Sequence, residues 1–236
     1  ALCQAEHDDI RECGFTNPVA IIPNGVVSRS CVSAKYPFPG LWKGKKILLY
    51  LGRLHKKKGL DTFLRTWCKV TGEQRDWRFA IVGNDDDDGY RNYLRSIIQS
   101  YDAQEMIKIY SAKYKEDKSD MFRHADAFVL PSFSEGFPMA VLEAMSHGLP
   151  VLMTEKCNFN KAFDLSAGYK ISLESSLLEE ELNAFLSMTD DLRRTIGVRG
   201  RALVANAYTF TAMSDKMLAV YSWLSGRGDK PSYVYE

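Results

Sequence analysis

The chain has 236 residues, of which 45% are hydrophobic and 26% are charged, a profile typical of a globular protein with a sizeable core. Its 31 Lys and Arg residues nearly balance its 30 Asp and Glu residues, and the formal net charge of +1 excludes an overall attraction to nucleic acid or to a membrane surface. The five scattered cysteines lack CxxC or zinc-site spacing and are typical of a reducing cytoplasm, and no apolar run approaches the roughly 18 residues that cross a bilayer.

The first 44 residues are interpreted as the edge of a preceding domain and a connector. Residues 1–22 predict a helix followed by the strand VAIIP, whereas residues 26–44 contain two prolines and two glycines, as linkers between domains often do. The N-terminus is acidic, unlike a secretory signal, and it has no initiator methionine. We therefore expect the chain to be cut from a longer protein.

From residue 45 to about residue 210, short apolar runs alternate with stretches of 3.6-residue periodicity. This pattern predicts an α/β fold, in which a parallel sheet is covered by helices on both faces. The predicted strands are 46–52, 77–83, 106–110, 126–132, 150–154 and 169–173. The predicted helices are 60–70, 90–101, 119–124, 138–147, 177–187, 190–206 and 210–224, and residues 231–236 are predicted to be a tail.

The loop after the first strand of this sheet, GRLHKKKG (52–59), is basic. Ligands of open α/β sheets bind outside the carboxyl ends of the strands, so this loop is a candidate binding element. Arg53, Lys56, Lys57 and Lys58 suit phosphate oxygens, and Gly52 and Gly59 allow a tight turn of the backbone. A solvated basic loop without a ligand is the alternative.

The segment SEGFPMAVLEAM (134–145) opens the helix predicted at 138–147. A helix start offers free N–H groups and the positive end of a dipole, which together favour an anion such as phosphate. Pro138 is predicted to be the first helical residue and has no N–H group to donate. The predicted backbone donors are therefore Phe137, Met139 and Ala140.

The same segment carries two glutamates, Glu135 and Glu143. Glu143 lies about 7.5 Å into the helix, and helical side chains lean back toward the N-terminus, so both carboxylates can face one pocket. Carboxylates only accept hydrogen bonds, so they suit the hydroxyl groups of ribose and hexose. Amides, cations and two carboxylates in one pocket fit a nucleotide diphosphate sugar. Alternatively, Glu135 is a helix-start acid and Glu143 a solvated helix residue.

The acidic loop NDDDDG (84–89) lacks the ligand spacing of a calcium site, so we predict no metal there. A turn that caps the following helix is the favoured interpretation. The sequence contains no GxSxG, HExxH or Walker motif, and VGNDDDDG is not a GxGxxG fingerprint. These absences argue against a serine hydrolase, a zinc protease, a P-loop enzyme and a nicotinamide-dependent enzyme.

Several segments together resemble the C-terminal, donor-binding half of GT-B glycosyltransferases, specifically glycosyltransferase family 4 (group 1). They are ILLYLGRLHKKKGLDTFL, WRFAIVG, AFVLPSFSEGFPMAVLEAMSHGLPV and TFTAMSDKMLAVYSWL, and IIPNGV is similar to the segment that leaves the N-terminal domain. The resemblance covers roughly residues 15–225. It implies a Rossmann-like parallel sheet of about six strands in residues 45–210, with residues 211–236 packing toward the N-terminal domain.

The resemblance also implies roles for individual residues. Arg53 and Lys58 match the pair that neutralises the donor diphosphate, Glu135 the glutamate that contacts the transferred sugar, and Glu143 the glutamate that holds the ribose hydroxyls. Arg53, Lys58 and Glu135 are the implied catalytic residues. The implied donor-binding residues are Gly52, Arg53, Lys58, Gly83, Ser111, Ala112, Glu135, Gly136, Phe137, Pro138, Met139 and Glu143. Position 111 is serine where the family often has glycine.

Members of the family retain anomeric configuration and generally need no metal or cofactor, with a UDP- or GDP-sugar as substrate. The implied function is transfer of a hexose to a hydroxyl of a glycan or lipid-linked acceptor in cell-envelope polysaccharide or lipopolysaccharide synthesis. The implied location is cytoplasmic, with membrane contact at the inner face through the missing N-terminal acceptor domain. Without that domain, we expect the chain alone to be inactive. The alternatives are a stand-alone nucleotide-sugar-binding or regulatory module, a phosphorylase and a sugar-nucleotide epimerase.

Overall fold

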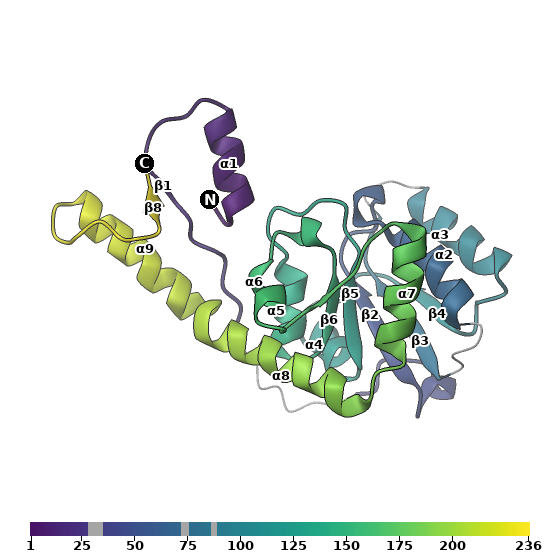
Figure 1. The fold of residues 1–236 in the computed structure, drawn as a ribbon. Helices are drawn as coiled ribbons and strands as arrows, with labels where there is room; N and C mark the ends of the chain where they lie inside the picture. Colours follow the sequence, from purple (N-terminus) through teal and green to yellow (C-terminus); the bar gives the residue numbers. More distant parts are fainter. Residues whose placement is uncertain (28–34, 72–75, 86–88) are drawn as a thin grey trace.

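A computed structural model describes residues 1–27, 35–71, 76–85 and 89–236, and its centre is a parallel six-stranded sheet (Figure 1). The strand order is β4-β3-β2-β5-β6-β7. The strands are β2 (Lys46–Leu51), β3 (Trp77–Val82), β4 (Ile107–Tyr110), β5 (Ala127–Leu130), β6 (Val151–Met153) and β7 (Tyr169–Lys170). The predicted α/β fold class is confirmed. Parts of the predicted connector and of the acidic loop, residues 28–34 and 86–88, lie outside the described residues.

The central strands form because their sequences are apolar without interruption. In β2 the four residues 47–50 are buried, and β5 is buried throughout. A strand that helices cover on both faces buries every side chain, so a continuous apolar run favours this position over a half-exposed one. Three tryptophans, Trp42, Trp67 and Trp77, are among the largest fully buried side chains.

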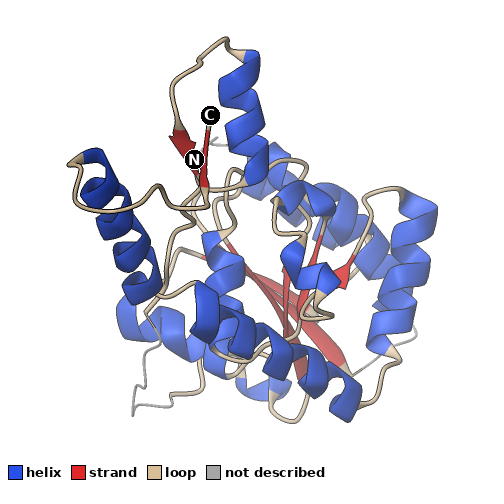
Figure 2. Ribbon diagram, turned by 60° about the vertical axis from the view of Figure 1, so that its left-hand side comes forward, coloured by secondary structure: helices blue, strands red, loops and turns tan. Residues whose placement is uncertain are grey.

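Helices cover both faces of the sheet (Figure 2). They are α2 (Leu60–Thr71), α3 (Tyr90–Ser100), α4 (Lys115–Arg123), α5 (Met139–Ser146), α6 (Lys161–Asp164), α7 (Ser175–Leu186) and α8 (Asp190–Ala207). From β2 to β4 the chain moves toward one edge of the sheet, and right-handed crossovers place α2 and α3 on one face. From β4 to β6 it moves toward the other edge, so α4 and α5 lie on the opposite face. Accordingly, α2 packs against α3 and α7, and α5 packs against α8.

The strand order reverses between β2 and β5, which are neighbours in the sheet but not in the sequence. At such a switch point the two loops leave the sheet in opposite directions and open a crevice. Hydrogen bonds join the two loops at this edge. The Phe133 N–H donates to the Lys57 carbonyl at 2.8 Å, and the Ser132 hydroxyl donates to the same oxygen at 3.0 Å. The two predicted binding segments therefore meet.

Other element ends differ from the prediction by at most three residues, helix α6 was not predicted, and three further corrections follow. Helix α4 begins at Lys115, four residues before the predicted start at 119, because its first turn is polar and gives no apolar signal. Pro138 precedes α5 instead of opening it. The predicted tail contains strand β8 (Val234–Tyr235), which pairs antiparallel with β1 (Val19–Ala20).

The two ends of the chain meet beside the sheet domain (Figure 1). Strands β1 and β8 join them, and the neighbouring helices are α1 (Gln4–Glu12) and α9 (Phe210–Leu224). Helix α9 has no buried residue, and three of its exposed side chains are Leu218, Tyr221 and Leu224. In the described residues, no helix is both long enough and apolar enough to cross a membrane. The division of the chain at residues 44 and 210 stays a prediction.

Candidate functional site

A pocket of about 700 Å³ opens at the carboxyl edge of the sheet, where the loops after β2, β3 and β4 meet α4 and α5. Six predicted site residues line it: Gly52, Arg53, Gly83, Ala112, Met139 and Glu143. The other six do not line this pocket: Lys58, Ser111, Glu135, Gly136, Phe137 and Pro138. The structure thus divides the predicted residues between the pocket and the neighbouring loops.

Two glycines bring the ends of β2 and β3 close together at the base of the pocket. A Cβ atom on Gly83 would lie 1.9 Å from the Gly52 carbonyl oxygen, a distance that real Cβ atoms essentially never show. The Gly83 N–H donates to the Tyr110 carbonyl at 3.1 Å, and its own carbonyl accepts from the Arg91 guanidinium at 2.6 Å. Only glycine fits at position 83, so this wall of the pocket consists of backbone.

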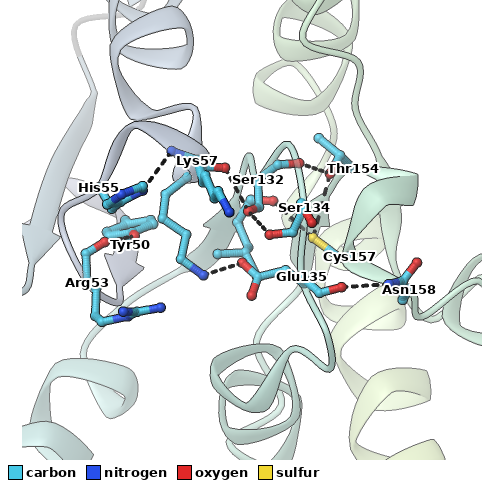
Figure 3. Close-up of polar contacts among 12 residues, drawn as sticks. Tyr50, Arg53, His55, Lys57, Ser132, Ser134, Glu135, Thr154, Cys157 and Asn158 are labelled. Carbon is cyan, nitrogen blue, oxygen red and sulfur yellow. Dashed lines mark hydrogen bonds and ion pairs between the residues drawn. The ribbon is translucent and has the colours of Figure 1, made fainter. Parts of the chain in front are cut away.

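Lys58 and Glu135 form an ion pair between the loops after β2 and β5. The Lys58 Nζ lies 2.6 Å from the Glu135 Oε1, and the side chains are only 15% and 11% exposed. Figure 3 shows Glu135 at this contact and Arg53 in the loop after β2. The Glu135 N–H donates to the Lys156 carbonyl at 3.0 Å, and the Glu135 carbonyl accepts from the Asn158 amide at 2.5 Å. Backbone hydrogen bonds therefore hold Glu135, and burial restricts the side chains of both residues.

The turn before α5 corrects the predicted set of backbone donors. The Met139 N–H donates to the Phe137 carbonyl at 3.0 Å, with Pro138 between them at φ −87° and ψ 76°. These values are close to an inverse γ-turn. Met139 is therefore already paired, and its prediction as a free donor is wrong. The N–H groups of Phe137 and Ala140 donate to no backbone carbonyl of the described residues.

Glu143 lines the pocket and pairs with a lysine that the sequence analysis did not single out. The Lys118 Nζ lies 2.7 Å from the Glu143 Oε1 and 2.6 Å from its Oε2. Lys118 is on α4 and Glu143 on α5, and their side chains are 27% and 32% exposed. The pair joins the two helices at the pocket wall.

The loop after β4 supplies further residues that sequence reasoning missed. Lys113 and Tyr114 of this loop and Lys115, the first residue of α4, line the pocket, and the Asn84 side-chain oxygen accepts from the Ala112 N–H at 3.0 Å. The signal was present in the lysines of SAKYKEDKS, a basic loop after a strand, as in 52–59. The described lining residues thus include four Lys or Arg side chains, Arg53, Lys113, Lys115 and Lys118, and one carboxylate, Glu143.

His147 lines the pocket at the end of α5. Burial lowers the pKa of His147, and the charges of Arg123 and Arg201 lower it further, so the imidazole is neutral at pH 7. Its ring stacks on Phe122, with centroids 5.2 Å apart. His147 therefore contributes packing to the pocket and no positive charge.

The fold and the cationic pocket define an α/β protein suited to an anionic ligand at the switch point of its sheet. A family model described as "Glycosyl transferases group 1" matches residues 33–202, well over half of the chain. The chain belongs to this family of glycosyltransferases, and its sheet and helices match the GT-B fold. In the described residues, no three His, Cys, Asp or Glu side chains are grouped to hold a metal ion.

Curated relatives support the assignment. The chain is 28% identical over 172 residues to an uncharacterized glycosyltransferase of Haemophilus influenzae, a match that covers 72% of this chain and 43% of the relative. It is 28% identical over 217 residues to the UDP-Gal:alpha-D-GlcNAc-diphosphoundecaprenol alpha-1,3-galactosyltransferase of Escherichia coli, a match that covers 86% of this chain and 54% of that protein. The chain therefore spans about half the length of these relatives.

A solved structure agrees with the fold. The crystal structure of Anabaena Alr3699/HepE in complex with UDP and glucose superposes with a TM-score of 0.81 at 16% sequence identity. The match covers 94% of this chain and 62% of that one. At this identity, the likeness concerns the fold alone.

Proposed function

We propose that the chain is the donor-binding half of a retaining, metal-independent family 4 glycosyltransferase. The donor is a nucleotide diphosphate sugar, and the reaction moves its hexose to a hydroxyl of a glycan or lipid-linked acceptor. The observation that carries the proposal is the pocket at the switch point, whose described lining includes Arg53, three lysines and one carboxylate, Glu143. The names of the Escherichia coli relative and of the Anabaena complex support a UDP-sugar donor.

The proposed chemical roles are those that the family resemblance implies, and the charge and hydrogen-bonding capacity of each group suit them. Arg53 and Lys58 bind the diphosphate and stabilise the negative charge that grows on the leaving group. Lys58 has three N–H donors and uses one toward Glu135, so it can hold a phosphate oxygen at the same time. The second oxygen of Glu135 accepts from a hydroxyl of the transferred sugar. Glu143 accepts from the ribose hydroxyls, and the Phe137 and Ala140 N–H groups donate to phosphate.

The acceptor site belongs in this proposal to an N-terminal acceptor domain, with which this chain forms the active-site cleft. Peripheral contact with the inner face of the plasma membrane would arise through that domain, in a protein of the cytoplasm. The diphosphoundecaprenol acceptor named for the Escherichia coli relative supports a lipid-linked acceptor. No partner nucleic acid is proposed.

We expect Glu143→Gln to weaken the binding of the preferred nucleotide sugar about tenfold or more, because a hydroxyl loses a charged acceptor. Isothermal titration calorimetry with UDP-, GDP- and ADP-sugars measures this. Glu116→Gln is the matched control, since Glu116 is exposed on α4 and does not line the pocket. Unchanged affinity in Glu143→Gln would contradict the ribose assignment, and no binding of any nucleotide sugar by the unaltered chain would overturn the proposal.

We also expect the 236 residues alone to transfer no sugar, because an acceptor must be held against the donor for the reaction to occur. The measurement is the conversion of a labelled donor into a glycoside, with glycan and lipid-linked acceptors offered in turn. Donor binding in the same samples is the control that the chain is folded. A glycoside product would refute the half-enzyme proposal.

A further inference from the structure

The Lys118–Glu143 pair stands in the pocket wall and not on the outer surface. Both residues line the pocket, and the ammonium nitrogen lies within 2.7 Å of both carboxylate oxygens. A ligand in the pocket therefore meets a carboxylate that already carries its counterion.

The backbones on both sides of this pair are fixed by packing. Lys118 is followed on α4 by four buried residues, 119–122, and Glu143 stands between the buried Leu142 and Ala144. The Lys118 N–H also donates to the Tyr114 carbonyl at 3.3 Å, as part of the first turn of α4. Packing thus fixes the two backbones, and the Lys118 and Glu143 side chains join α4 to α5.

Stability alone gives little reason for a lysine at this position. Lys118 lies in the first turn of α4, close to the positive end of the helix dipole, where a cation is disfavoured. Partly exposed Lys–Glu pairs add little to the free energy of unfolding. The position is better explained by what the lysine does to Glu143.

Hydrogen-bonding capacity shows how the pair can bind a diol. A carboxylate has about four acceptor positions, two on each oxygen. Lys118 occupies one position on each oxygen of Glu143, which leaves one on each for a hydroxyl. A ribose presents two neighbouring hydroxyl donors, so Glu143 can accept both while it stays paired. The ammonium meanwhile cancels the repulsion between Glu143 and a diphosphate in the same pocket.

We propose that Lys118 is a positioning residue that fixes the Glu143 carboxylate for the ribose hydroxyls and so makes the site selective for ribonucleotides. The inference rests on the proposed function, because it names the device that orients the ribose-binding carboxylate. Without Lys118, the Glu143 side chain carries an uncompensated charge at a partly buried site and turns toward solvent or another cation. The diol then loses its acceptor although Glu143 itself is still present.

The test compares UDP with 2′-deoxy-UDP by calorimetry on the full 236-residue chain. For the unaltered chain we expect UDP to bind about tenfold more tightly, the effect of one hydrogen bond to a charged group. Lys118→Met should reduce this preference to about twofold or less, whereas Lys118→Arg should keep most of it. In the Glu143→Gln background, Lys118→Met should change the preference no further, because the two residues act as one unit.

Lys115→Met is the matched control, because it removes another pocket-lining lysine from the same helix. It should weaken both nucleotides equally and leave their ratio unchanged. Circular dichroism checks folding, and Lys118→Gln replaces Lys118→Met if the latter does not fold. If the preference for UDP over 2′-deoxy-UDP falls in Glu143→Gln but not in Lys118→Met, this inference is overturned and the proposed function is not affected. If the unaltered chain binds no nucleoside diphosphate, the proposed function fails as well.

Discussion

Lys58→Met is expected to weaken the binding of a nucleoside diphosphate about 100-fold, near the upper end for a hydrogen bond to a charged group. Two effects add. The diphosphate loses a cation, and the Glu135 carboxylate, which is only 11% exposed, loses the partner 2.6 Å away and then repels the ligand. Calorimetry with UDP measures the loss without any contribution from the sugar.

Variants around the pair separate these two effects. Lys56→Met removes an exposed lysine of the same loop and should leave the affinity almost unchanged. Glu135→Gln added to Lys58→Met removes the uncompensated carboxylate and should restore part of the affinity for UDP, but not the contact of Glu135 with the sugar. If Lys58→Met and the unaltered chain bind UDP with equal affinity, Lys58 is not part of the donor site.

Gly83→Ala is expected to lower the free energy of unfolding by about 3 kcal/mol, near the upper end for overpacking. The new Cβ would lie 1.9 Å from the Gly52 carbonyl oxygen. A backbone oxygen at the end of a central strand cannot rotate away as a side chain can, so β2 and β3 must move apart. Urea denaturation measures the change through the midpoint and the slope.

Gly136→Ala is the control for this substitution, because a Cβ at Gly136 meets no atom within 4 Å. Its effect on the free energy of unfolding should stay within about 0.5 kcal/mol. Movement at Gly83 would also displace Gly52 and the following Arg53, so Gly83→Ala should bind nucleotide poorly even below its unfolding transition. Equal urea midpoints for both variants would show that the two strand ends separate without cost.

Much of the fold could be predicted from local pattern. The apolar run KILLYLG predicted the central strand β2, and the Gly-Arg and Glu-Gly-Phe-Pro segments were placed correctly at the ends of β2 and β5. Local pattern failed where the local signal was weak. The first turn of α4 has no apolar residue, and the pairing of β1 with β8 joins residues from opposite ends of the chain.

The sequence by itself determined the α/β class, the succession along the chain of the strands and helices of the sheet domain except α6, the family resemblance and the chemical types in the loops, because side-chain periodicity and turn residues act over short distances. The tertiary structure decided which of those groups lie together and which line the pocket. It paired Lys58 with Glu135, 77 residues apart, and Lys118 with Glu143, 25 residues apart. Such contacts depend on the strand order and on helix packing, which bring distant segments together and which no local pattern encodes.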